Sequence, residues 1–220
     1  MQVTGRPSWS LAIGDDQQLT MALCVRDASA LVVADDGVPP PLLEPLPPAE
    51  VLGEQDPAAV GRDWLTWWQA LVRFYLDGQD APRVDTSEGR VWLTERAQRR
   101  AAVGDLSDDF AGLAHQPALQ RACRALAGEA LEASRRWPDP SRGWLGSTDV
   151  GTIVREVAAA RGAAEHTLTG TVVVLPTATA WWRLVEPGAV LASVGAPPEQ
   201  VVRAALYSSA PRHPGGADRP

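Results

Sequence analysis

The chain has 220 residues, of which 45% are hydrophobic and 21% are charged, as is ordinary for a folded globular protein. The net charge of −7 opposes binding to a polyanion, so we do not expect nucleic-acid binding. All 20 basic residues are arginine. The absence of lysine excludes P-loop nucleotide hydrolases, Schiff-base enzymes and protein kinases, since each needs a lysine.

The cysteines and the start of the chain bear on the cellular compartment. Cys24 and Cys123 stand far apart in apolar sequence, so we expect buried free thiols. No signal peptide is evident, and no stretch has the roughly 20 apolar residues needed to span a bilayer. We therefore expect a soluble, cytoplasmic protein without membrane association. The composition, rich in arginine, alanine, glycine and proline, is typical of a GC-rich bacterial genome.

The N-terminal segment alternates apolar and polar residues, which is the pattern of half-buried strands. Residues 8–13, 19–25 and 30–34 are predicted strands and would form an antiparallel meander. A helix over residues 17–33 is the competing prediction, because alanine, leucine and methionine are good helix formers.

A proline-rich segment, VPPPLLEPLPP, covers residues 38–48. Proline removes backbone donors and fixes φ, so neither a helix nor a central strand is expected there. We favour an ordered polyproline connector packed by its leucines. A linker between two domains and a proline-rich ligand are the alternatives.

Helices are predicted for the middle of the chain. Asp56 and Pro57 are a strong helix start, and the helix should run to about Leu76 with Gly78 as its stop. Trp64, Trp67 and Trp68 lie in its apolar stripe. Further helices are predicted over residues 90–103, 117–137 and 149–161.

The C-terminal part returns to strands. Residues 167–175 form a β-branched run, and residues 181–194 have the pattern of a hairpin. A last helix is predicted over 198–206, and we expect residues 207–220 to be a disordered tail.

The element order predicts an α+β fold. We expect an antiparallel sheet built from the N-terminal and C-terminal strand sets, packed against the central group of helices. Residues 1–206 would form a single domain, with a possible division at the connector 38–48.

Nine tryptophans are an unusual feature of this chain. Trp181 and Trp182 are neighbours on a predicted strand, so they point to opposite faces of the sheet and cannot share one core. Trp144 lies in a turn-rich loop. Exposed tryptophans are effective binding anchors, so these three residues are the candidates for contact with a partner protein. The alternative role for tryptophans is core packing.

Arginines cluster on the helix predicted over 90–103. Arg96 and Arg100 are at i,i+4 on one face and could bind a phosphate, a carboxylate or an acidic partner. The alternative is a solvated helix face whose arginines pair with nearby acids, namely Glu88, Glu95 and Asp105.

Catalytic chemistry has little support in the sequence. His115, His166 and Cys123 are the candidates for a scattered site, but no hydrolase, protease or dinucleotide-binding signature surrounds them. The aspartate pairs fall at predicted turns and caps. We therefore assign no catalytic residue and expect neither a metal nor a cofactor.

The favoured function is a non-catalytic protein-interaction or accessory protein, such as an adaptor, an immunity-like protein or a subunit of a larger bacterial assembly. Its partner would be another protein or a second copy. The alternative is an enzyme or a small-molecule or anion-binding protein, with a site assembled from scattered histidines, cysteines and arginines.

Overall fold

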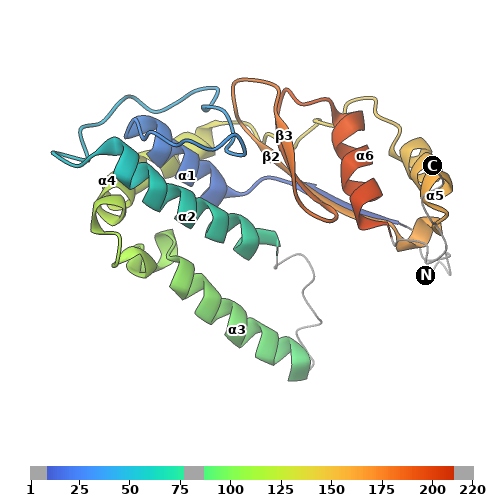
Figure 1. Cartoon of the computed structure of the whole chain (residues 1–220), viewed down its shortest axis with the longest axis horizontal. Coiled ribbons are helices and arrows are strands. Elements are labelled where there is room, and N and C mark those ends of the chain that lie inside the picture. The colour runs from blue at the N-terminus through green and yellow to red at the C-terminus, as the bar shows by residue number, and fades with distance from the viewer. Residues whose placement is uncertain (1–8, 77–86, 211–220) are drawn as a thin grey trace, which may run out of the picture. The chain divides into compact units, whose positions relative to one another are not determined.

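The computed structural model of the chain describes residues 9–76 and 87–210. The contacts divide the chain into two compact units. Unit 2 runs from Asp16 to Pro138, whereas unit 1 combines Met1–Asp15 with Asp139–Pro220. In sequence, unit 2 is therefore an insertion in unit 1, and Figure 1 traces the elements of both.

Unit 1 is built on a sheet whose strand order in the described residues is β1-β2-β4-β3. The strands are β1 (Ser10–Gly14), β2 (Thr169–Leu175), β3 (Trp182–Glu186) and β4 (Ala189–Ser193). Helix α5 (Val150–Arg161) begins at the cap Asp149 and ends at Gly162, as its sequence predicts. Helix α6 (Pro198–Ser209) packs against β2 and β4, and α5 packs against α6.

The core of unit 1 lies between these two helices and one face of the sheet. Val172 and Val174 of β2 pair with Val190 and Ala192 of β4, and all four are fully buried in this core. Gly170 of β2 lies close to β1 and α6, since an added Cβ would be 3.0 Å from the Leu11 side chain and 3.4 Å from the side chains of Ala205 and Leu206. A larger residue at this position would require the Leu11 side chain to shift.

The prediction of an antiparallel sheet is wrong. β1 pairs with β2 in parallel, β2 pairs with β4 in parallel, and β3 is antiparallel to β4. The run Val172–Leu175 is fully buried on both of its faces, as is typical of a parallel strand. The uninterrupted apolar sequence of this run was therefore the feature that indicated parallel pairing. The predicted hairpin over 181–194 is confirmed as β3 and β4.

Unit 2 is helical in the part that the structure describes. Its helices are α1 (Gln17–Ala28), α2 (Pro57–Leu76), α3 (Ser87–Val103) and α4 (Pro117–Arg136). Short 3-10 turns, Leu106–Asp108 and Ala111–Leu113, connect α3 to α4. The predicted helices are confirmed, with α3 starting three residues earlier than expected. The predicted stop at Gly78 lies outside the described residues.

The predicted strands over 19–25 and 30–34 are wrong, whereas the one over 8–13 corresponds to β1. Residues 17–28 form α1, close to the competing helix prediction. The Asp16 carboxylate caps this helix by accepting the Leu19 N–H at 2.8 Å. The helix is buried almost all round, so its apolar residues did not follow a helical stripe and the alternation was misleading.

The tryptophan stripe of α2 is confirmed as core. Trp64 is fully buried and donates its indole N–H to the Ala22 carbonyl of α1 at 2.8 Å. Trp67 donates to the Gly104 carbonyl at 3.2 Å, and Trp68 stacks on Trp64 with ring centroids 5.4 Å apart. Each buried indole with a polar partner joins α2 to a neighbouring segment.

The proline-rich segment 38–48 lies inside unit 2 and is anchored to α1. Arg26 donates hydrogen bonds to the carbonyls of Pro39 and Pro40, and Asp27 accepts the Leu42 N–H at 2.8 Å. Leu42 and Leu46 are buried, whereas Leu43 is 58% exposed. These contacts agree with an ordered connector that is packed by two of its three leucines.

Helix α6 extends to Ser209, so residues 207–209 of the predicted tail are helical. Residues 211–220 of that tail lie outside the described part. No helix within the described ranges carries an apolar run long enough to cross a membrane.

Gly61 and Gly128, two helical glycines of unit 2, allow a matched test of how closely the backbone packs around each of them. A Cβ on Gly61 of α2 would lie 2.2 Å from the Val32 carbonyl oxygen, whereas a Cβ on Gly128 of α4 would meet nothing within 4 Å. We expect Gly61→Ala to lower the free energy of unfolding by about 1–3 kcal/mol because backbone must move. Gly128→Ala should raise it by about 0.5–1 kcal/mol. Urea unfolding of both variants measures this, and an equal effect of both would contradict the close approach.

Candidate functional site

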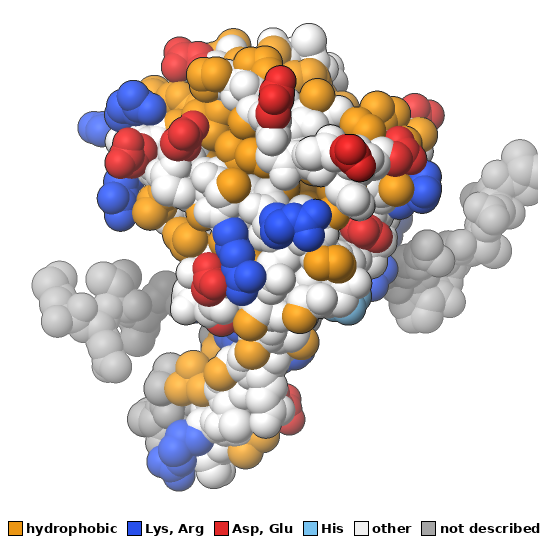
Figure 2. Space-filling view, turned by 90° about the vertical axis from the view of Figure 1, so that its left-hand side faces the viewer, with side chains coloured by type: hydrophobic (Ala, Val, Ile, Leu, Met, Phe, Trp, Pro, Cys, Tyr) orange, Lys and Arg blue, Asp and Glu red, His pale blue; other side chains and the backbone are white. Residues whose placement is uncertain are grey.

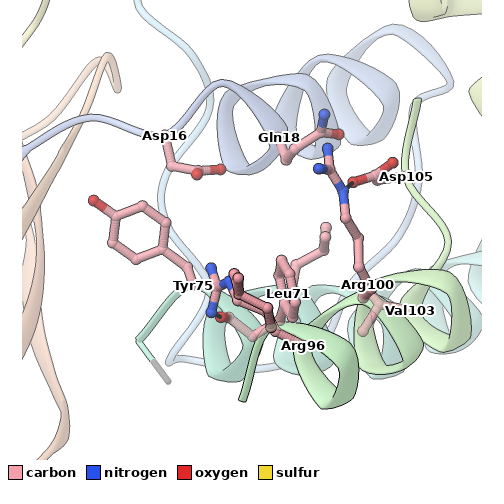
Figure 3. Close-up of a pocket in the computed structure, with 11 residues that line it drawn as sticks. Asp16, Gln18, Leu71, Tyr75, Arg96, Arg100, Val103 and Asp105 are labelled. Carbon is pink, nitrogen blue, oxygen red and sulfur yellow. Dashed lines mark hydrogen bonds and ion pairs between the residues drawn. The ribbon is translucent and has the colours of Figure 1, made fainter. Parts of the chain in front are cut away.

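A pocket of about 440 Å³ opens between α1, α2 and α3 of unit 2 (Figure 3). Its polar lining comprises Asp16, Gln18, Tyr75, Arg96, Arg100 and Asp105. Its apolar lining comprises Leu71, Phe74, Leu93, Ala97 and Val103. The volume is in the range of natural small-molecule sites.

The two arginines predicted to bind an anion line this one pocket. Arg96 and Arg100 are one helical turn apart on α3, so both side chains leave the helix on the same side. Helix α3 buries only Gly89 among its described residues, and this leaves its arginines at the protein surface. The structure brings the pair together as expected; anion binding stays a prediction.

Asp105 holds Arg100 in place. Its carboxylate pairs with the Arg100 Nε and also accepts the Ser107 N–H at 2.7 Å. Gly104 precedes it with φ +74, and an added Cβ there would lie 2.9 Å from the Gly112 backbone nitrogen. A glycine is therefore required for the turn that aims Asp105 at Arg100.

The pKa of Asp105 reflects two opposing effects. Burial alone would raise the pKa of this carboxyl, but hydrogen bonds from Ser107 and Arg100 outweigh burial and lower the pKa below its usual value. Asp105 is therefore ionised at neutral pH and stays paired with Arg100.

Arg96 contacts two aromatic side chains and a backbone carbonyl. Its guanidinium carbon lies 4.4 Å from the Phe74 ring centroid and 5.2 Å from that of Trp92. Its Nη1 donates to the Phe74 carbonyl at 3.3 Å. Stacking and a backbone acceptor fix the plane of this cation at the pocket wall.

Gln18 reaches the pocket from α1 and points toward Arg100 (Figure 3). Its Oε1 is buried and has no hydrogen-bond partner within the described part of the chain. A buried amide oxygen without a donor is costly, so this atom is a place where a ligand donor would be favourable.

Sequence reasoning missed part of this site. Gln18 was overlooked because α1 was predicted as a strand, and Tyr75 because it was counted only as apolar stripe. Asp105 was treated only as a neutralising neighbour. Its position directly after a helix-ending glycine was the signal that could have assigned it an orienting role.

The histidine candidates are not brought together. His166 is exposed in the 3-10 turn Glu165–Thr167 of unit 1. His115 is exposed in unit 2 and lines a second, shallower hollow of about 410 Å³ with Arg73 and Arg99. Neither histidine lines the pocket of Figure 3, so neither could serve as an acid or a base for a reaction in that pocket.

The cysteine candidate is buried as a free thiol, as is Cys24. Burial, with a smaller contribution from the Asp27 carboxylate, raises the pKa of Cys24 to about 12. Burial also raises the pKa of Cys123. A thiol that stays protonated at neutral pH is a poor nucleophile, so Cys123 does not support covalent catalysis.

The tryptophan candidates of unit 1 fall in different environments. Trp144 is buried in the core beside α5 and α6, so its ring offers no partner surface. Trp181 is half-buried just before β3, and Trp182 begins β3 with 38% of its surface exposed. The register opposes Trp182 to Ala192 of the α6-covered face, so Trp181 points to the other face, as the alternation predicts.

Within the described ranges, no group of three or more His, Cys, Asp or Glu side chains is placed to hold a metal ion. Comparisons with protein-family models, curated proteins and solved structures find no match to this chain. Its function is therefore inferred from its own geometry.

The Arg100–Asp105 pair generates a pH-dependent stability prediction. We expect Asp105→Asn to lower the free energy of unfolding by about 1–2 kcal/mol at neutral pH, because a partly buried charge-assisted bond is lost. The pKa of Asp105 is lowered by folding, so its contribution is full above about pH 5 and is lost as the pH falls through the lowered pKa. The difference between variant and wild type should therefore shrink in acid.

Asp109→Asn is the control, because Asp109 pairs with Arg124 on an exposed surface and its left-handed backbone suits asparagine. It should change stability by less than about 0.5 kcal/mol. Urea unfolding at several pH values measures both variants. A constant difference for Asp105→Asn at all pH values would contradict the assigned role.

The buried thiols predict a loss of stability in alkali. In the unfolded chain a thiol ionises near about pH 8.5, whereas the raised pKa of Cys24 keeps it protonated in the folded chain. Stability should fall with rising pH by up to about 1.4 kcal/mol per pH unit for each thiol. The double variant Cys24→Ala, Cys123→Ala should lack this component in urea unfolding. Equal slopes for variant and wild type would show that the thiols are not shielded.

Proposed function

We propose that this chain is a non-catalytic protein-interaction protein that binds an extended segment of a partner protein along β3. The observation that carries the proposal is that all five residues of this edge strand are exposed. Three of them are large and apolar, namely Trp182, Leu184 and Val185, with exposed fractions of 38%, 42% and 38%. An exposed apolar edge strand is a template for another strand.

The backbone of β3 supports strand addition. The Ser193 N–H donates to the Trp181 carbonyl at 2.8 Å, so the backbone groups of Trp181 face β4. Because these groups alternate along a strand, those of Trp182 and Leu184 face the open side of the sheet. They could accept and donate the main-chain bonds of an added strand, while the apolar side chains select its residues.

The side chains of β3 indicate what kind of segment it would bind. Leu184 and Val185 are adjacent apolar residues, and Glu186 follows them at the end of the strand. We therefore expect the bound segment to be extended and apolar, with one basic residue placed to meet Glu186.

The opposite edge of the sheet and the helical unit 2 are weaker candidates for binding an added strand. In β1, at the opposite edge, Leu11 and Ile13 are only half-exposed against the core of unit 1. On the face of the helices in Figure 2, apolar side chains are interspersed with acidic and basic ones. Val32 is an exposed apolar residue of unit 2, but the described part of that unit contains no strand, so it offers no strand edge beside Val32.

The test is selection of a random peptide library against the immobilised chain, followed by affinity measurement on variants. We expect the selected peptides to be apolar and to lose at least about tenfold in affinity for Leu184→Lys, because a charge is placed on the paired edge. Val32→Lys is the matched control, since Val32 is 60% exposed but lies in unit 2. It should bind as wild type does.

Hydrogen exchange gives an independent readout, in which a bound peptide should slow exchange of the Trp182 and Leu184 amides. Peptides unaffected by Leu184→Lys, or no selected peptide at all, would refute the proposal. A dimer in light scattering that Leu184→Lys dissociates would identify the occupant of β3 as a second copy instead.

A further inference from the structure

We propose that the pocket of unit 2 is a binding site for a small organic acid, namely a carboxylate with a compact apolar body and a hydroxyl group beside the carboxylate. This inference is independent of the function proposed for β3, because the pocket is built from unit 2 alone. Three observations carry it: the donors of Arg100, the buried acceptor of Gln18 and the apolar walls between them.

Arg100 presents unused donors. Its Nε is taken by Asp105, and this is the one polar partner that its guanidinium has within the described residues. The two outer nitrogens are left with a fixed orientation, because the Asp105 bond fixes the guanidinium plane. A guanidinium oriented in this way offers a fork that matches a carboxylate.

The two carboxylates that line the pocket, Asp105 and Asp16, do not cancel the attraction between Arg100 and an anionic ligand. Asp105 is nearly buried, and its oxygens are occupied by Arg100 and Ser107. Asp16 accepts the Leu19 N–H at the start of α1, where a helix terminus stabilises a negative charge. An incoming anion therefore meets arginine donors, with Arg96 adding a second cation at the wall.

Gln18 defines the second polar contact. Its Oε1 is buried without a donor, and its side chain points toward Arg100 (Figure 3). A ligand whose carboxylate meets Arg100 would place a neighbouring group close to this oxygen. That group must donate a hydrogen bond to satisfy it, as a hydroxyl beside the carboxylate does.

The remaining walls require an apolar body. Leu71 and Phe74 of α2 and Leu93 and Val103 of α3 supply the apolar lining of the pocket, and the volume of about 440 Å³ suits a body of one ring. The shallower hollow beside His115 has two arginines, Arg73 and Arg99, but no buried atom in need of a partner, so it carries no equal argument.

The experiment uses 3-phenyllactate as the probe, with two relatives that each lack one feature. Titration calorimetry of the full chain at low salt should show saturable 1:1 binding with a Kd below about 1 mM. Replacing the carboxylate, as in 3-phenylpropane-1,2-diol, should weaken binding at least about tenfold. Removing the hydroxyl, as in 3-phenylpropionate, should weaken it about threefold or more.

Variants locate the site. Arg100→Gln should lose at least about tenfold in affinity for 3-phenyllactate and most of the preference for the acid over the diol. Gln18→Leu should bind 3-phenyllactate and 3-phenylpropionate equally, since the acceptor is gone. Arg99→Gln is the matched control, because Arg99 neighbours Arg100 on α3 but lines the other hollow. It should leave the affinity unchanged.

Folding is checked by the amide spectrum of each variant. If Arg100→Gln fails to fold, Arg100→Lys keeps the charge opposite Asp105 and should still lose affinity, because the fork is absent. Absence of saturable binding by both acids up to about 10 mM would overturn the proposal. Equal affinity for acid and diol, or equal losses in Arg99→Gln and Arg100→Gln, would overturn it as well.

Discussion

The helical unit depends on one buried cation. Arg26 is 6% exposed, and its guanidinium pairs with Asp27, binds two carbonyls of the proline-rich segment and lies 5.6 Å from the Trp64 ring. A charge removed from water needs all of these partners together. Because they come from α1, the segment 38–48 and α2, the cation fixes the position of a segment that forms neither a helix nor an extended strand. With that segment in place, α1 and α2 are held where they form two walls of the pocket.

Sequence patterns identified the elements whose ends carry their own chemical signals. Helices α2 and α4 begin at a proline, and α5 is capped by Asp149 at its start and by Gly162 at its end, so local chemistry specified them. The patterns failed at α1, where burial on every side removed the helical stripe that distinguishes a helix from a strand. They also failed for strand direction, because the pairing of β1 with β2 depends on a partner far away in the chain.

For a similar reason, some residues of the candidate sites could be predicted from the sequence and others could not. Arg96 and Arg100 could be paired from spacing alone, because one turn of one helix brings them together. The contributions of Gln18 and Asp105 depend on how separate segments meet, which spacing does not encode. Trp182 and Trp144 differ in exposure although both are tryptophans, because one begins an edge strand and the other faces a core.

The insertion of unit 2 into unit 1 has a consequence for the order of folding. Ser10 of β1 pairs with Thr169 of β2, so β1, which precedes the other described strands of the sheet, waits for a neighbour that is synthesised after all of unit 2. Unit 2 is continuous and helical, and its contacts can form while the rest of the chain is still being made. Strands β2, β3 and β4 are close in sequence and can pair without β1. Docking of β1 closes the longest loop in the sheet, so we infer that it completes unit 1 last, and that its residues stay without a sheet partner until then.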